Sequence, residues 1–194
     1  MKRSALFTCM MIVALVAGAL SAEAANRTDE GFVGRPAPPV EVGGDGCPPG
    51  AFVTGPLPWN DTGDTCAGFT NTVTSYAGVC TLPFPYGGED VIYEMTLGAG
   101  NTVDFSMDIT GSTGDLVLFI LSTCGDGNTC VANSQDSIGP GVGPELIAAA
   151  AYTPGTYYVY IDSYYAAGTA GSCGTYDLTV SGTVPAELIN FSAE

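Results

Sequence analysis

The hexapeptide LVLFIL at positions 116–121 is an unbroken apolar run, closely bracketed by glycine and aspartate residues. Its length is typical of a strand, because helices in globular proteins usually run for about 10–12 residues or more. A strand that is apolar on both faces is typical of the interior of a sheet covered on both sides. The run therefore predicts a central strand with both faces buried.

Two segments upstream of this run alternate between apolar and polar residues. Apolar side chains recur at every second position in residues 91–97 and again in residues 103–109. This is the period of a strand with one face in the core and one in water. Short turns rich in glycine separate the segments, and many short strands at this spacing predict an all-β, jelly-roll-like β-sandwich. The further strands expected are residues 130–133, 145–151, 156–162 and 175–181.

The two ends of the chain differ from this β region in composition. Residues 1–24 read as a signal peptide, with Lys2 and Arg3, an apolar run and a small-residue cleavage site. The predicted organisation is a signal peptide, a Gly/Pro-rich irregular N-terminal arm, a β-sandwich domain and a C-terminal tail or linker, at residues 1–24, 25–58, 59–182 and 183–194. A signal peptide predicts a secreted or cell-surface protein.

The charge of the mature chain is strongly negative. After the signal only Arg27 and Arg35 are basic, histidine is absent, and nineteen acids bring the formal charge to −17. Such a surface repels nucleic acid and anionic membranes, so we expect neither as a partner. The missing residue types exclude histidine triads, lysine Schiff bases and histidine-ligated metals. The expected partner is a protein or polysaccharide at the cell surface.

Six cysteines remain once Cys9 leaves with the signal peptide. An even number in an exported chain is typical of disulfide bonds, although six cysteines allow 15 pairings. Cys124–Cys130 is favoured because a turn-forming loop separates the two residues, and Cys66–Cys80 because the chain between them is short. Cys47–Cys173 then follows by elimination.

Five stretches are similar to a known family: EDVIY at 89–93, GDLVL at 114–118, ANSQDS at 132–137, PGTYYVYID at 154–162 and GTYDLTV at 174–180. With these motifs the chain resembles the bacterial pre-peptidase C-terminal domain. The resemblance implies a secreted β-sandwich that normally accompanies a catalytic domain. It also implies a cysteine pair after the third strand, which Cys124 and Cys130 match. The family often has two adjacent acids where this chain has Gln135-Asp136.

Acidic residues at the strand ends are candidate calcium ligands. Ca²⁺ takes six to eight oxygen ligands, and the loops of a sandwich bring residues distant in sequence to its two ends. Asn60, Asp61 and Asp64 are expected to form a further acidic turn in the arm. The alternative is that these acids are solvated turn formers. The predicted calcium ligands are Asp115, Asp136, Glu145, Asp162, Glu89 and Asp90.

Tyrosines crowd the strand expected at 156–162 and the loop after it. In a strand, Tyr157 shares one face with Val159 and Ile161, while the next two tyrosines take the other face. Exposed tyrosine rings can stack on sugars or dock on proteins, but tyrosines also simply fill sheet faces. The candidate ligand-binding residues are Tyr158, Tyr160, Tyr164, Tyr165 and Trp59.

Catalysis is not expected. A pair of carboxyl groups can hydrolyse glycosides without histidine or lysine, but nothing in the sequence singles out one pair. There is also no nucleophile elbow and no zinc motif. The sequence predicts an exported, non-catalytic accessory or surface domain with calcium as its candidate cofactor. The alternatives are a carbohydrate-binding module that uses residues 157–165 and a small carboxylate-based hydrolase.

Overall fold

The computed structural model describes residues 43–80, 84–134 and 139–183. No helix in these three ranges is long and apolar enough to span a membrane. The expected strands are confirmed, with ends that differ by no more than two residues. The strands of the described part are β1 (Trp59–Asp64), β2 (Val91–Leu97), β3 (Thr102–Asp108), β4 (Leu116–Leu121), β5 (Cys130–Asn133), β6 (Glu145–Ala151), β7 (Gly155–Ser163) and β8 (Thr175–Thr183).

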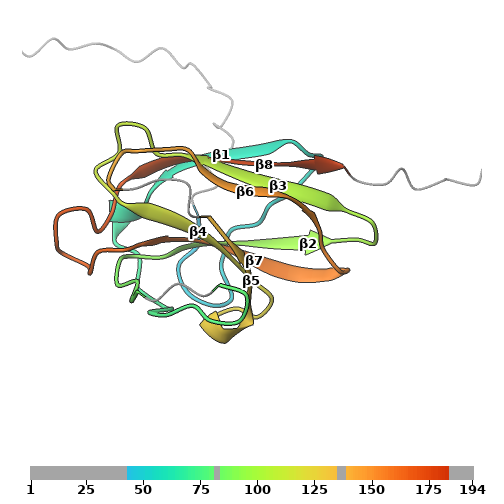
Figure 1. The fold of residues 1–194 in the computed structure, drawn as a ribbon, viewed down its shortest axis with the longest axis horizontal. Helices are drawn as coiled ribbons and strands as arrows, with labels where there is room; N and C mark the ends of the chain where they lie inside the picture. Colours follow the sequence, from blue (N-terminus) through green and yellow to red (C-terminus); the bar gives the residue numbers. More distant parts are fainter. Residues whose placement is uncertain (1–42, 81–83, 135–138, 184–194) are drawn as a thin grey trace, which may run out of the picture. The chain divides into compact units, whose positions relative to one another are not determined.

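The strands form two antiparallel sheets, in the orders β1-β8-β3-β6 and β2-β7-β4-β5. β1 pairs with β8, β2 with β7, β3 with β6 and β4 with β5, as in one long hairpin that is folded over on itself. Figure 1 shows the two sheets as facing layers. This arrangement is a jelly roll, so the predicted jelly-roll β-sandwich is confirmed.

The main core lies between the two sheets and follows the predicted period of two. Tyr157, Val159 and Ile161 of β7 point into it, and Leu178 and Val180 of β8 enter it from the other sheet. Alternate residues of β2 and β3 fill the rest of this layer. Burial of these apolar side chains is the main source of stability of the sandwich.

A second core lies on the outer face of the β2-β7-β4-β5 sheet. Residues 69–80 and 84–86, here called the covering segment, pack Val73, Tyr76 and Tyr86 against Phe119 and Leu121 of β4. The rings of Tyr76 and Phe119 stack with centroids 3.6 Å apart. Leu116, Leu118 and Ile120 of β4 face the other side of the sheet and belong to the main core. β4 is therefore buried on both faces, as LVLFIL predicts.

The described part of the N-terminal arm lies along the free edge of β2. The N–H groups of Gly44 and Val53 donate to the carbonyls of Ile92 and Glu94, at 3.0 and 2.8 Å. Because β2 is an edge strand of its sheet, these bonds satisfy groups that would otherwise be open to pairing. Ala51 is buried in the main core, and Val53 and Leu57 pack against it, so apolar contacts hold the arm as well as these bonds.

One prediction about the arm is wrong. Asn60, Asp61 and Asp64 do not form an acidic turn but belong to β1, which pairs with β8 along its whole length. Its polar side chains are tolerated because β1 is an edge strand with every second residue exposed. Gly63 is required on the inner side, because a Cβ there would run into the hydroxyl group of Tyr176.

All six cysteines form disulfides, as predicted, but the three favoured pairings are wrong. The pairings follow neighbours in the fold rather than neighbours in sequence. Cys66 and Cys173 meet because they flank the paired strands β1 and β8. The other two bonds join the arm and the covering segment to the sandwich. The observed pairs are Cys47–Cys124, Cys66–Cys173 and Cys80–Cys130.

Candidate functional site at the loop end of the sandwich

Four of the predicted calcium ligands gather at one end of the sandwich, on the left in Figure 1. The strand registers place Asp90 and Asp115 beside the end of β7 that carries Asp162. Glu145, the first residue of β6, lies within electrostatic reach of Asp115. The fold therefore brings these four acids, which are distant in sequence, to the same end of the sandwich.

Asp90 and Asp162 are fully buried and lie next to each other across the paired strands β2 and β7, where the charge of Asp90 acts on Asp162. Oδ2 of Asp90 accepts from the N–H and the hydroxyl of Thr72, at 2.6 and 2.7 Å, and from the N–H of Val73 at 3.0 Å. Oδ2 of Asp162 accepts from the hydroxyl of Tyr76 at 2.7 Å. The pair therefore fastens the covering segment to the edge of the sheet.

Two carboxyl groups in such contact need a shared proton. No hydrogen-bond donor of the described chain reaches Oδ1 of Asp90, so this buried oxygen is able to accept a proton held by its neighbour. Burial, followed by the charge of Asp90, raises the pKa of Asp162 well above its ordinary value of 3.8. Burial also raises the pKa of Asp90, although the hydrogen bonds from Thr72 and Val73 oppose this effect. We therefore expect Asp162 to be the member of the pair that holds the proton and donates it to Asp90.

Asp115 and Glu145 form a second acidic pair. Glu145 is buried and Asp115 is half-buried. Burial and the charge of Glu145 raise the pKa of Asp115, while the N–H of Gly139 lowers it. The hydroxyl of Tyr86 lies near these acids. Its burial, followed by the negative charges of Asp162, Asp115 and Glu145, raises its pKa to about 12. Negative charge is therefore concentrated beneath the surface of this end.

The acidic residues fit a metal ion only in part. Within the described ranges, no group of three or more acidic or cysteine side chains is close enough to hold one. Asp90 and Asp162 do not fit a cation, since their oxygens accept from protein donors and share a proton. Asp115 and Glu145 fit a cation better, because their two negative charges repel each other and a cation between them would relieve that repulsion. Of the remaining predicted ligands, Glu89 is half-buried next to Asp90, and Asp136 lies outside the described residues.

Three of the aromatic candidates serve the cores instead. Tyr160 is fully buried, and its hydroxyl accepts from the N–H of Gly125 at 2.8 Å and contacts Sγ of Cys47 at 3.1 Å. Its prediction as a ligand-binding residue is wrong, because the covering segment closes the sheet face on which it lies. Tyr158 and Trp59 are half-buried against the second and the main core, respectively.

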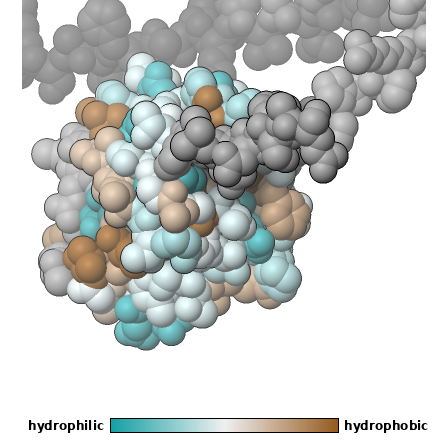
Figure 2. Space-filling model, turned by 90° about the vertical axis from the view of Figure 1, so that its right-hand side faces the viewer, coloured by the Kyte–Doolittle hydropathy of each residue, from teal (hydrophilic) through white to brown (hydrophobic). Residues whose placement is uncertain are grey.

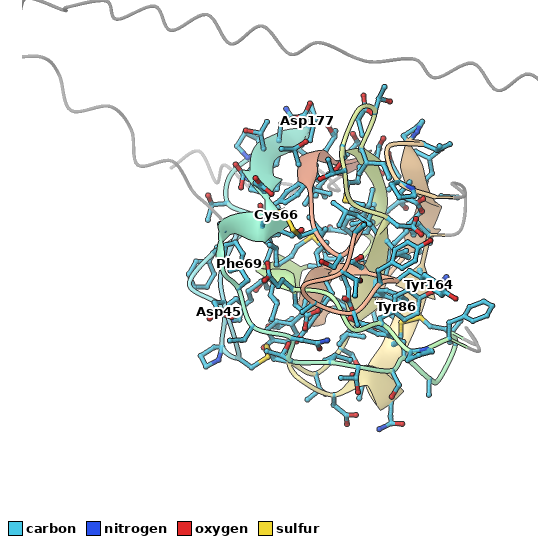
Figure 3. The ribbon with its side chains drawn as sticks, turned by 90° about the vertical axis from the view of Figure 1, so that its left-hand side faces the viewer. Asp45, Cys66, Phe69, Tyr86, Tyr164 and Asp177 are labelled. Carbon is cyan, nitrogen blue, oxygen red and sulfur yellow. A yellow bond between two sulfur atoms is a disulfide. The ribbon has the colours of Figure 1, made fainter. Side chains whose placement is uncertain are left out.

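The other two candidates are exposed and belong to an aromatic cluster. Tyr164 and Tyr165 are each 38% exposed, and Phe84, which the sequence analysis missed, is 49% exposed. The ring centroids of Tyr164 lie 5.5 Å from Phe84 and 5.1 Å from Tyr165. We call these three residues the aromatic corner. Figure 3 looks onto this end and shows Tyr164 beside Tyr86, the buried ring behind the corner.

Backbone contacts hold the aromatic corner in place. The N–H of Tyr164 donates to the carbonyl of Asp115 at 3.2 Å, and that of Tyr165 donates to the hydroxyl of Ser163 at 3.3 Å. The ring of Tyr165 lies against Gly171, where a Cβ would come within 2.7 Å of the ring. The loop then ends at Cys173, which is in a disulfide. The rings are therefore preorganised, which lowers the entropic cost of binding a partner.

The opposite end of the sandwich has a different surface. Figure 2 shows it as a mosaic in which hydrophobic areas alternate with white and hydrophilic ones. Scattered exposed apolar residues are normal on the surface of a protein, whereas exposed rings in contact with one another are less usual. The aromatic corner is therefore the stronger candidate for binding.

The carboxyl pairs do not offer an open catalytic site. Asp90 and Asp162 have no exposed surface, and Glu145 is 1% exposed. Glycoside hydrolysis needs two carboxyl groups on either side of a substrate bond, so both must be reachable from solvent. Neither pair meets this requirement.

No family model and no curated protein matches the chain. Among solved structures, the chain is similar to the pre-peptidase C-terminal domain of a collagenase from Bacillus anthracis, at 19% sequence identity and a TM-score of 0.41. The match covers 75% of this chain and 99% of that domain.

Proposed function

We propose that this chain is an exported, non-catalytic accessory domain that binds a partner at the cell surface through the loop end of its sandwich. The aromatic corner is the observation that supports binding there, since it presents three rings on a fixed backbone. Export is supported by the composition of residues 1–24 and by the three disulfides, which persist in oxidising compartments.

The absence of catalysis is supported by the way in which the acids are used. The Asp90–Asp162 pair fastens the covering segment, and Glu145 is closed off from solvent. A carboxylate-based hydrolase is therefore the weakest alternative. A carbohydrate-binding module stays open, since exposed tyrosine rings also stack on sugars.

A retention assay tests the binding end. We expect the full mature chain to bind at least one member of a panel of surface polysaccharides and purified surface proteins. We expect the Tyr164→Ala/Tyr165→Ala variant to bind that member at least tenfold more weakly, because both rings leave the contact. The matched control is Phe52→Ala, which removes an equally exposed ring, 45% exposed, from the arm. Equal binding by the double variant and the wild type would refute the proposed site.

Calcium stabilisation is a second part of the proposal and is supported by the facing charges of Asp115 and Glu145. Extracellular calcium sites have dissociation constants of about 10⁻⁴–10⁻³ M, so 10 mM Ca²⁺ is expected to stabilise the native state by about 1–3 kcal/mol. Scanning calorimetry with Ca²⁺, with Mg²⁺ and with chelator checks this expectation. The Asp115→Asn variant should lose the calcium effect, and a midpoint that is the same with Ca²⁺ and chelator would rule the site out.

A further inference from the structure

The aromatic corner lies on a surface that has no positive charge of its own. After Arg35 the sequence holds no lysine, arginine or histidine, so all ionised side chains of the described residues near neutral pH are acids. A partner with many acids or phosphates would be repelled at every approach, whereas a basic partner would be steered in. Charge complementarity therefore favours a cationic partner.

The ring geometry of the corner points the same way. Tyr164 is surrounded by rings set nearly at right angles to its own: Phe84 at 78°, Tyr86 at 82° and Tyr165 at 85°. Sugar rings stack on a flat ring face, and rings at right angles do not form one continuous flat surface. Rings at right angles instead present ring faces in more than one direction, and each exposed face attracts an ammonium or guanidinium group.

The acids behind the corner add to this attraction. The backbone carbonyl of Asp115 accepts a hydrogen bond from the N–H of Tyr164. The negative charges of Asp115 and Glu145 also act on the hydroxyl of Tyr86. The ring centroid of Tyr86 lies 6.2 Å from that of Tyr164. These two carboxyl groups repel each other. A positive charge held at the corner would relieve that repulsion as well as interact with the rings.

The corner is also rigid enough to select a ligand. The N–H of Ala167 donates to the carbonyl of Gly87 at 2.7 Å, and the N–H of Gly87 donates to the carbonyl of Ser163 at 3.2 Å. These bonds tie the loop with the tyrosines to the segment with Phe84. Rings that are already held in place before binding lose less conformational entropy when a ligand is bound.

We propose that the aromatic corner of Phe84, Tyr164 and Tyr165 binds lysine or arginine side chains of a basic partner protein. This inference rests on the proposed function of the loop end and names the chemistry of its ligand. The acids supply long-range attraction and the rings supply the specific contact.

The test uses the full mature chain and two synthetic peptides of equal length. One peptide alternates lysine with glycine, and the other is the same peptide with every lysine acetylated. Titration calorimetry is expected to show binding of the lysine peptide and at least tenfold weaker binding of the acetylated one. Tyr164→Ala is expected to weaken binding of the lysine peptide about tenfold, the loss of one favourable cation–π contact. Tyr164→Phe keeps the ring and should bind within about threefold of wild type.

Matched variants separate binding at the aromatic corner from general charge attraction. Phe52→Ala has the same net charge as Tyr164→Ala and should bind the lysine peptide like wild type. Phe84→Ala provides a second removal of a ring of the corner if Tyr164→Ala proves unstable in thermal melting. Equal weakening by Phe52→Ala and Tyr164→Ala would overturn the inference, because attraction to the acidic surface alone would then explain binding.

The same experiment distinguishes failure of the inference from failure of the proposed function. If a neutral polysaccharide is retained through Tyr164 and Tyr165 while the lysine peptide is not bound, the loop end binds a partner but the cationic assignment is wrong. If the lysine peptide is not bound and no member of the panel of surface polysaccharides and proteins is retained either, both proposals fail.

Discussion

Replacement of Cys66 and Cys173 together by serine is expected to lower the free energy of unfolding by about 4–5 kcal/mol. The two residues are separated by 107 positions, and in the chain-entropy model a bond across so long a loop removes much of the freedom of the unfolded chain. Urea denaturation of wild type and variant at equal protein concentration measures the loss.

The Cys80→Ser/Cys130→Ser variant is the matched control for loop length. Its bond spans 50 positions, so the same model predicts a loss of about 4 kcal/mol, since the entropy grows only slowly with length. The Cys66–Cys173 variant differs in one further respect, because Cys173 closes the loop that carries the aromatic corner. It should therefore also weaken binding at the corner. A loss below about 1 kcal/mol for either variant would contradict the entropic explanation.

Asp90→Ala is expected to cost about 3–5 kcal/mol of stability. The substitution removes the oxygen that accepts from the N–H and the hydroxyl of Thr72 and from the N–H of Val73. Each buried donor left without a partner costs about 1–3 kcal/mol. The covering segment would then separate more easily from the second core. Asp90→Asn keeps an acceptor oxygen, so it should cost much less. Equal losses for the two variants would show that the hydrogen bonds are not the cause.

The same pair gives a pH dependence whose sign follows from the raised pKa of Asp162. Between its ordinary value of 3.8 and its higher value in the fold, the folded state binds more protons than the unfolded state. Stability from this pair is therefore complete below about pH 3.8 and falls as pH rises through the pKa of the folded state. In the Asp162→Asn variant, residue 162 is a permanent N–H donor to Asp90 that does not titrate. The stability of this variant should therefore fall less than that of wild type between pH 4 and 8. Parallel profiles from denaturation at several pH values would exclude the shared proton.

The sequence predicts the strands well, because the period of two in residues 91–97 and 103–109 depends only on which side chains face the core. It also predicts that LVLFIL is buried on both faces, but not by what, since the covering segment has no period of its own. β1 is missed because an edge strand can be almost entirely polar. The disulfide pairing is missed because it depends on which strands are neighbours.

The candidate site is predicted in part. The gathering of Asp90, Asp115 and Asp162 follows from their places at strand ends. That Asp90 and Asp162 lie close enough to share a proton depends on the β2–β7 register, which the sequence does not display. Phe84 leaves one usable signal: it lies between two prolines, so it cannot enter a regular strand and stays in an exposed loop.

The three disulfides overlap along the chain, because Cys47–Cys124 spans the beginning of the loop that Cys66–Cys173 closes. Any single peptide bond cut between residues 47 and 173 therefore falls inside at least one closed ring of the polypeptide. Both products of such a cut stay covalently joined, and the jelly roll can keep its shape around the break. For a domain proposed to work outside the cell, a nick by a foreign protease would leave the molecule in one piece.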